Sequence, residues 1–157
     1  MTLQKIQSDL KETFKTGDEL KRSVLRMLIS AIYNKQIEKR TREKTGRDVE
    51  LTEEELLGVI SSEAKKRKDA SEQFEKGGRP ELAAKEKSEL DMLMAYLPAQ
   101  MSEEELRAKV KEAIAKSGAK SEKDFGKVMA ALMRETKGRA EGGAVSKIVK
   151  EEMAKLG

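Results

Sequence analysis

The chain has 157 residues, of which 37% are hydrophobic, 39% charged and only 3% aromatic, and its formal net charge is +4. It contains no cysteine and no histidine, which excludes disulfides, thiolate catalysis, Cys/His metal sites and the commonest general base near neutral pH. A core built from Leu, Ile, Val, Met and Ala favours packed helices over a β-sandwich. We therefore expect an all-α protein with no metal and no cofactor.

The N-terminus and the hydropathy pattern predict where the protein resides. The first five residues, Met1-Thr2-Leu3-Gln4-Lys5, lack the apolar run of a secretory signal. No segment approaches the roughly 18 apolar residues that a membrane-spanning helix needs. These features predict a cytoplasmic protein that does not associate with a membrane, and we expect it to be a monomer.

Two helices are predicted on either side of Gly17. Thr2 is a good N-cap for the first helix, and its apolar residues recur at helical spacing on one face. These residues are Leu3, Ile6, Leu10 and Phe14. Asp18 can cap the second helix, which is apolar nearly all round over residues 24–33 and should therefore lie in the middle of a bundle.

The second helix also carries polar and basic residues. Its one polar stripe is formed by Arg22, Arg26, Ser30 and Asn34. Towards its end the helix turns basic, through Lys35, Lys39, Arg40, Arg42 and Lys44. A loop at residues 45–48 follows.

The third helix begins at a capping box formed by Thr52 and Glu55 and ends at residues 77–78, a pair of glycines. Pro80 suits the first position of a fourth helix, which Pro98 closes. This proline is the natural domain boundary.

Three more helices are predicted after a short hinge at residues 99–101. Ser102 and Glu105 form a second capping box, Gly118 ends the fifth helix, and Ser121 with Asp124 caps the sixth. A glycine-rich turn precedes the last helix. We expect an N-terminal four-helix bundle-like domain, residues 1–97, followed by a small three-helix tail domain, residues 98–157.

Two glutamates interrupt the inward stripe of the fourth helix. Glu86 and Glu89 lie three residues apart on one face, and a buried carboxylate without a partner is costly. We expect a structural ion-pair network with Arg26 or Arg67, because Arg–carboxylate bonds are among the stronger side-chain contacts. The alternative is an enzyme in which either glutamate lies in an open cleft, without a neutralising arginine and with a raised pKa.

Basic residues are concentrated in the final two helices. Residues 127–150 contain six basic and two acidic residues, a net charge of +4 that equals the surplus of the whole chain. The basic residues are Lys127, Arg134, Lys137, Arg139, Lys147 and Lys150. A compact helix pair with this charge suits phosphate contacts. Because no aromatic residues are interleaved, recognition of RNA shape and backbone is favoured over base reading.

Two other features are weaker signals. The turn at residues 138–143 offers backbone N–H groups before a helix, which attract anions, but it lacks a nucleotide-binding fingerprint and is interpreted as a helix–turn–helix corner. The basic run at residues 65–68 points in different directions around a helix and is interpreted as a solvated face.

Several linked motifs occur in order along the chain. Residues 25–32 read LRMLISAI, residues 74–79 read FEKGGR, and residues 96–98 read YLP. The tail contributes Gly126, Val128, Met129 and Gly138. Together these motifs resemble the GatB/YqeY family, and specifically its stand-alone YqeY-like proteins, over essentially the whole chain.

This resemblance implies a helical bundle followed by a helical tail. The tail is similar to that of the B subunit of tRNA-dependent amidotransferases, which helps to hold tRNA. The chain lacks the large domain that carries the active site of that subunit, so no carbon–nitrogen ligase activity is expected of it.

The expected function is a non-catalytic tRNA-binding or tRNA-enzyme accessory module, with tRNA or a tRNA-handling enzyme as its partner. The alternative is a protein–protein interaction module that docks on an enzyme subunit. In that case Met92, Met94 and Met101 could provide adaptable contacts.

Overall fold

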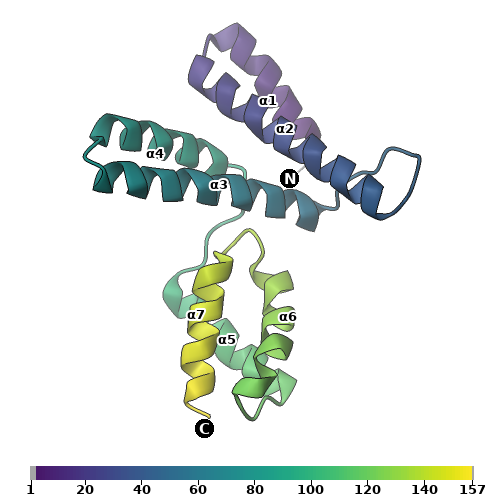
Figure 1. Cartoon of the computed structure of the whole chain (residues 1–157), viewed down its shortest axis with the longest axis vertical. Helices are drawn as coiled ribbons and strands as arrows, with labels where there is room; N and C mark the ends of the chain where they lie inside the picture. Colours follow the sequence, from purple (N-terminus) through teal and green to yellow (C-terminus); the bar gives the residue numbers. More distant parts are fainter. Residues whose placement is uncertain (1–2, 157) are drawn as a thin grey trace. The chain divides into compact units, whose positions relative to one another are not determined.

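The structure, a computed structural model, describes residues 3–156 (Figure 1). Its regular elements are seven α-helices and one short 3-10 helix, and no strand occurs in this range. The predicted all-α fold class is confirmed. The chain divides into two compact units, Met1–Leu97 and Pro98–Gly157, and each has a hydrophobic core of its own. The expected N-cap, Thr2, lies outside the described residues.

The N-terminal unit is built from two helical hairpins (Figure 1). Its helices are α1 (Leu3–Thr16), α2 (Glu19–Arg42), α3 (Glu53–Lys76) and α4 (Pro80–Met94). Helix α1 packs along α2, and α3 packs along α4.

The helix ends in this unit follow local signals in the sequence. Gly17 adopts a left-handed conformation with φ of 73°, which glycine reaches at low cost. The side chain of Asp18 accepts a hydrogen bond from the Lys21 backbone N–H at 2.9 Å. The capping box of Thr52 and Glu55 is present in both directions, so these three predictions are confirmed.

The core of the N-terminal unit is formed by residues from all four helices. Its buried members are Ile6, Val24, Leu25, Leu28, Ile32, Leu56, Ile60, Ala64, Leu93 and Tyr96. The Tyr96 hydroxyl donates a 2.6 Å hydrogen bond to Asp9 on α1. Burial and this carboxylate raise the pKa of Tyr96. The bond therefore ties the turn that follows α4 to the first helix.

Two expectations about buried residues are wrong. Phe14 is 57% exposed rather than part of the core, and the Arg22 guanidinium lies 4.5 Å from its ring centroid. Helix α2 is not enclosed, because Met27 and Tyr33 are exposed on it. The main contacts of α2 are with α1, α3 and α4, and the exposed Met27 and Tyr33 show that part of its circumference faces solvent.

The C-terminal unit contains three α-helices and one 3-10 helix. They are α5 (Glu103–Ser117), η1 (Glu122–Asp124), α6 (Phe125–Thr136) and α7 (Gly142–Ala154). Their buried core residues are Leu106, Val110, Ile114, Val128, Leu132, Val145, Ile148, Val149 and Met153.

Two of the three helix ends predicted from the sequence for this unit are confirmed. Ser102 and Glu105 form the predicted capping box, and Gly118 ends α5 with φ of 67°. The prediction that Ser121 caps the sixth helix is wrong, since its side chain makes no capping hydrogen bond. The 3-10 helix η1 intervenes, and Asp124 instead accepts a 2.9 Å hydrogen bond from the Lys120 backbone N–H.

Among the described residues, no helix is both long enough and apolar enough to cross a membrane.

Candidate nucleic-acid interface

The predicted basic residues lie on the hairpin formed by α6 and α7. The inner face of α6 carries the buried residues Val128 and Leu132, and that of α7 carries the buried residues Val145 and Val149. Because these apolar positions face the core, polar positions between them are directed away from it. The two helices pack against each other, so their outward side chains belong to one compact element.

Four of the six predicted cations are exposed. They are Lys127, Arg134, Lys147 and Lys150. Within residues 3–156, none of these four has a carboxylate oxygen within 4.0 Å, the distance of an ion pair. The pKa of Asp124 is lowered mainly by a hydrogen bond from the Lys120 backbone N–H. The positive charge of Lys127 lowers it further, from a longer distance. The four exposed cations are therefore available to an anionic partner.

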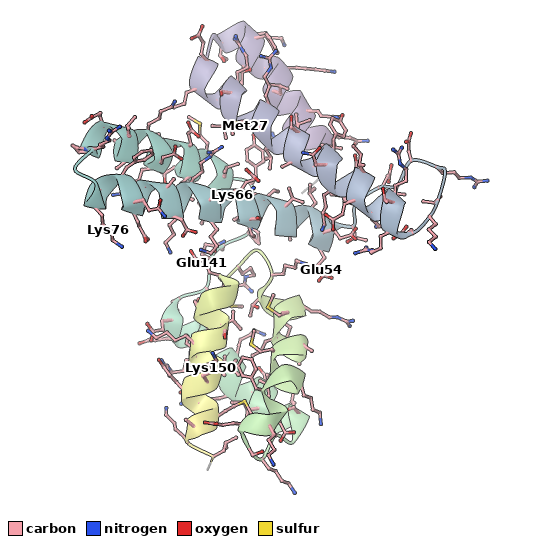
Figure 2. The ribbon with its side chains drawn as sticks, viewed as in Figure 1. Met27, Glu54, Lys66, Lys76, Glu141 and Lys150 are labelled. Atoms are coloured by element: carbon pink, nitrogen blue, oxygen red, sulfur yellow. The ribbon has the colours of Figure 1, made fainter. Side chains whose placement is uncertain are left out.

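Lys150 is oriented by an aromatic ring. Its ammonium nitrogen lies 5.8 Å from the centroid of the Phe125 ring, within the range of a cation–π interaction. Figure 2 shows Lys150 on α7. Since Phe125 begins α6, this contact joins the two helices and keeps the charge at the surface.

Arg139 and the turn around it have a structural role. The Arg139 Nε donates to the Ala99 carbonyl at 3.1 Å, and the backbone N–H of Met101 donates to the Arg139 carbonyl at 2.8 Å. The Gln100 amide donates to the Gly138 carbonyl at 2.7 Å. Arg139 and Lys137 are half-buried. The turn between α6 and α7 is thus fastened to the hinge segment, and these two predicted residues differ from the four exposed cations.

Several cations elsewhere in this unit are bound to acidic side chains. Lys109 on α5 forms a 2.9 Å ion pair with Glu135, and Lys116 forms a 2.6 Å ion pair with Glu112. These two lysines therefore differ from the exposed cations of α6 and α7. Lys111, Lys120 and Lys123 are exposed as well and, among the described residues, form no ion pair, but they lie outside the two packed helices.

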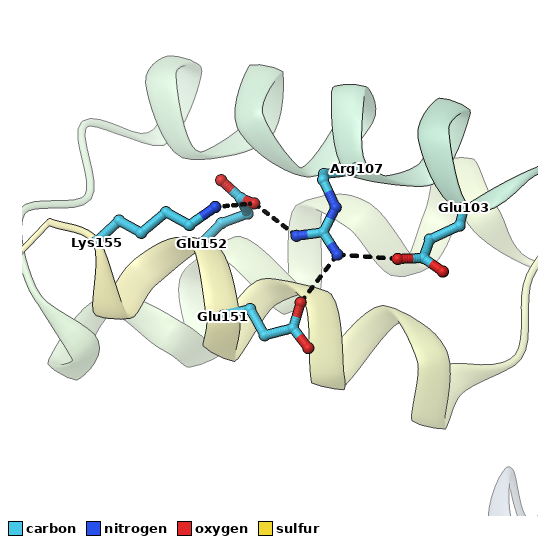
Figure 3. Close-up of polar contacts among 5 residues, drawn as sticks. All are labelled: Glu103, Arg107, Glu151, Glu152 and Lys155. Atoms are coloured by element: carbon cyan, nitrogen blue, oxygen red, sulfur yellow. Dashed lines mark hydrogen bonds and ion pairs between the residues drawn. The ribbon is translucent and has the colours of Figure 1, made fainter.

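Arg107 on α5 lies at the centre of a further ion-pair cluster, which the sequence did not indicate (Figure 3). Its guanidinium is 2.7 Å from Glu152, 2.9 Å from Glu151 and 3.0 Å from Glu103. Glu103 lies four residues before Arg107 on the same helix and was the one signal available. The two acids on α7 lie more than forty positions away, so only packing of α5 on α7 brings them there.

The cluster lowers the pKa of Glu152 from 4.5 to about 2, through hydrogen bonds from Lys155 and then Arg107. The ionised carboxylate consequently stabilises the folded state above pH 4.5, and this contribution is lost as the pH falls towards about 2. We expect Arg107→Met to lower the melting temperature at pH 7 and to have a smaller effect at pH 3, where part of this contribution has already been lost.

Thermal unfolding followed by circular dichroism at both pH values measures this difference. Lys116→Met is the matched control, since its partner Glu112 is an exposed neighbour on the same helix, and such pairs contribute little. An equal loss of stability at pH 7 and pH 3 in Arg107→Met would contradict the electrostatic explanation.

The two glutamates of α4 are held by one of the two predicted arginines. Arg67 Nε lies 3.1 Å from Glu89, and Arg67 Nη1 lies 3.7 Å from Glu86. All three side chains are mostly buried. Arg67 Nη2 also donates to the sulfur of Met27 at 3.4 Å, which joins α3 to α2. A neutralising arginine is therefore present, against the requirement of the enzyme alternative.

The expected role of Arg26 in this network is wrong. Arg26 is exposed and forms no ion pair with Glu86 or Glu89. Its position on α2 faces solvent because this helix is enclosed on only part of its circumference.

The methionines proposed as adaptable contacts pack inward. Met92 and Met94 are partly buried against the core of the N-terminal unit, and Met101 is partly buried against that of the C-terminal unit. In the part of the chain that the structure describes, no group of three or more acidic side chains is arranged to hold a metal ion.

Comparison with known proteins identifies relatives that match part of the chain. They include yeast proteins named "Altered inheritance of mitochondria protein 41, mitochondrial". The protein from Vanderwaltozyma polyspora is 33% identical over 92 residues, which cover 59% of this chain and 46% of the relative. The protein from Lachancea thermotolerans is 35% identical over 108 residues, covering 67% of this chain and 54% of the relative.

The chain thus spans about half the length of the curated relatives it matches. A family model described as "Yqey-like protein" matches residues 3–153, nearly everything that the structure describes. This match includes both helical units, and it agrees with the motifs read along the sequence. The chain belongs to the family of YqeY-like proteins.

Proposed function

We propose that the α6–α7 hairpin binds the phosphate backbone of RNA, with tRNA as the favoured ligand, and that the protein is a non-catalytic accessory module. The observation that carries the proposal is a set of four exposed cations on two packed helices, none of which has a carboxylate partner within residues 3–156. Arg107, Lys109 and Lys116 of the same unit are paired with acids, whereas these four cations lie together on one pair of packed helices.

The mechanism is electrostatic. Each cation that contacts a phosphate releases condensed counterions, and this release drives binding without regard to base sequence. Phe125 is half-buried beneath Lys150 and so is poorly placed to stack on a base. The hairpin consequently suits recognition of RNA shape and backbone rather than of sequence.

A titration of purified protein with fluorescently labelled tRNA, repeated between 50 and 200 mM salt, tests the proposal. We expect affinity to fall steeply with salt. The fourfold variant Lys127→Glu, Arg134→Glu, Lys147→Glu and Lys150→Glu should reduce the slope of log K against log salt by about four. Affinity should fall by roughly a hundredfold or more at 100 mM salt.

A control variant with the same change in net charge carries Lys11→Glu, Arg26→Glu, Lys76→Glu and Arg79→Glu. All four residues are exposed, and all lie in the N-terminal unit, outside the hairpin. This control should bind tRNA nearly as well as the wild type. Wild-type binding that does not depend on salt, or equal binding by the fourfold variant and the control, would contradict the proposal.

The partner in the cell is either tRNA itself or a tRNA-handling enzyme. Recovery of an enzyme together with the protein after complete nuclease digestion would favour direct docking on that enzyme. Loss of the association on digestion would favour RNA as the link.

Location and assembly state remain predictions. The relatives compared above carry the word "mitochondrial" in their names, whereas the sequence of this chain predicts a cytoplasmic protein. Fractionation of cells that express it, and light scattering of the purified protein, would measure its location and the expected monomer.

A further inference from the structure

A second concentration of positive charge lies in the N-terminal unit, at the end of α2 and in the loop that follows it (Figure 1). Residues 35–47 contain six basic and two acidic residues, a net charge of +4. This window has the same balance as the α6–α7 hairpin, although it belongs to the other unit. The function proposed above makes no use of it.

Contacts within the unit neutralise the first part of this window. Lys35 forms a 2.9 Å ion pair with Glu38. Lys39 forms a 2.7 Å ion pair with Glu55 and also donates to the Glu50 carbonyl at 3.0 Å. Lys35 is therefore explained by a neighbour on the same helix, and Lys39 by the packing of α2 against the start of α3.

The last part of the window is not neutralised. We call Arg42, Lys44 and Arg47 the α2-end cluster. All three side chains are exposed, and within the described residues none has a carboxylate oxygen within ion-pair distance. Arg40, beside them, reaches only the fully exposed Asp48, at 3.7 Å. The cluster thus presents charge to solvent in the same manner as the four cations of the hairpin.

The backbone at Lys44 is unusual. Helix α2 ends in a Schellman motif, in which the Lys44 N–H donates to the Thr41 carbonyl and the Thr45 N–H donates to the Arg40 carbonyl, both at 3.3 Å. The motif requires a left-handed residue, and Lys44 adopts φ of 50°. Glycine is the usual occupant, because a side chain is strained there.

Lys44 differs from the other residues that adopt positive φ. Four further residues in the described range have positive φ, and all are glycines. They are Gly17, Gly78, Gly118 and Gly138. Lys44 is the exception within residues 3–156, and departures from a local rule are expected where function requires them.

The helix dipole offers a simpler explanation for part of the charge. Cations in the last turn of a helix are stabilised by its carbonyl end, which accounts for Arg42. The effect declines beyond that turn, so it does not account for Arg47, five residues past Arg42. Nor does it require a lysine in place of glycine in the left-handed position.

We propose that the α2-end cluster is a second site for the phosphate backbone of RNA, so that the protein binds one RNA through both of its units. The identity of the ligand rests on the function proposed for the hairpin, whereas the site itself rests on the contacts and the backbone described here. Two linked sites raise the overall affinity, because binding at the first holds the ligand near the second.

Lys44→Gly separates this proposal from a purely structural role. It relieves the strained left-handed residue, so we expect a higher melting temperature. It also removes one phosphate contact, so the salt slope for tRNA should decrease by about one. A variant that becomes more stable but keeps the wild-type affinity and slope would overturn the proposal.

The triple variant Arg42→Gln, Lys44→Gly and Arg47→Gln measures the whole cluster. Its salt slope for tRNA should decrease by about three, while the triple control Lys11→Gln, Lys15→Gln and Lys76→Gln should keep the wild-type slope. Equal binding by the triple variant and its control would overturn this proposal, even if the fourfold hairpin variant loses binding.

The converse result distinguishes the two proposals. Loss of tRNA binding in the triple variant, with full binding in the fourfold hairpin variant, would support the α2-end cluster and overturn the function proposed for the hairpin. Binding of the wild type to vesicles containing anionic phospholipid, without binding to tRNA, would overturn the assignment of RNA as the ligand.

Discussion

Truncation of Ile60 to alanine is expected to lower the free energy of unfolding of the N-terminal unit by about 3 kcal/mol. Ile60 is completely buried in the core that α2, α3 and the other helices of this unit share. Removing its outer carbons loses the transfer free energy of those atoms and leaves a cavity. The C-terminal unit should keep its stability, because its core is formed by other residues.

Native-state hydrogen exchange resolves the two units and is the appropriate measurement. Protection should decrease in α2 and α3 but remain unchanged in α6 and α7. Ile37→Ala is the matched control, since this isoleucine is 51% exposed on α2 and its truncation should change stability by less than about 0.5 kcal/mol.

The reciprocal variant completes the experiment. Leu132→Ala truncates a residue that is buried in the C-terminal core, and it should reduce protection there alone. A single cooperative loss of protection across both units, in either variant, would contradict the expectation that the two separate cores are stabilised independently.

Replacement of Arg67 by methionine is expected to destabilise the N-terminal unit by about 3 kcal/mol. The side chains of Arg67, Glu86 and Glu89 are all mostly buried. Without the guanidinium, Glu86 would remain in a poorly hydrated site without its counterion, and Glu89 would keep only the exposed Lys85, whose ammonium lies 4.0 Å away. Removing one partner of a buried pair is therefore more costly than the net value of the pair itself.

Chemical denaturation monitored by circular dichroism measures the loss. Arg26→Met is the matched control on the adjacent helix, and its exposed side chain should make the substitution nearly neutral. A further variant, Arg67→Met with Glu86→Gln and Glu89→Gln, should recover much of the stability because it removes the unpaired charges. Equal effects of Arg67→Met and Arg26→Met would contradict this explanation.

The same two arginines show how far the ion-pair network could be predicted. Glu86 and Glu89 interrupt an apolar stripe, and this pattern alone indicated that a buried cation must meet them. The choice between Arg26 and Arg67 depended on which face of each helix is covered. Arg67 lies where α3 packs along α4, whereas Arg26 lies on the uncovered side of α2.

The residues of the candidate interface were likewise predicted only in part from the sequence. Counting charges along residues 127–150 identified all six basic side chains. It could not distinguish Arg139, which donates to the carbonyl of Ala99, from Lys147, which is exposed without an ion pair. The distinction arises from the hinge segment, whose backbone folds onto the turn between α6 and α7.

The sequence by itself determined the helices, their capping boxes and the glycines that end them, because these signals act over three or four neighbouring residues. Tertiary structure alone decided which charges remain unpaired, since a carboxylate such as Glu152 meets Arg107 from 45 positions away. It also decided that Phe14 faces solvent beside Arg22. Helical periodicity defines a face, but only the packing of other helices determines whether that face is covered.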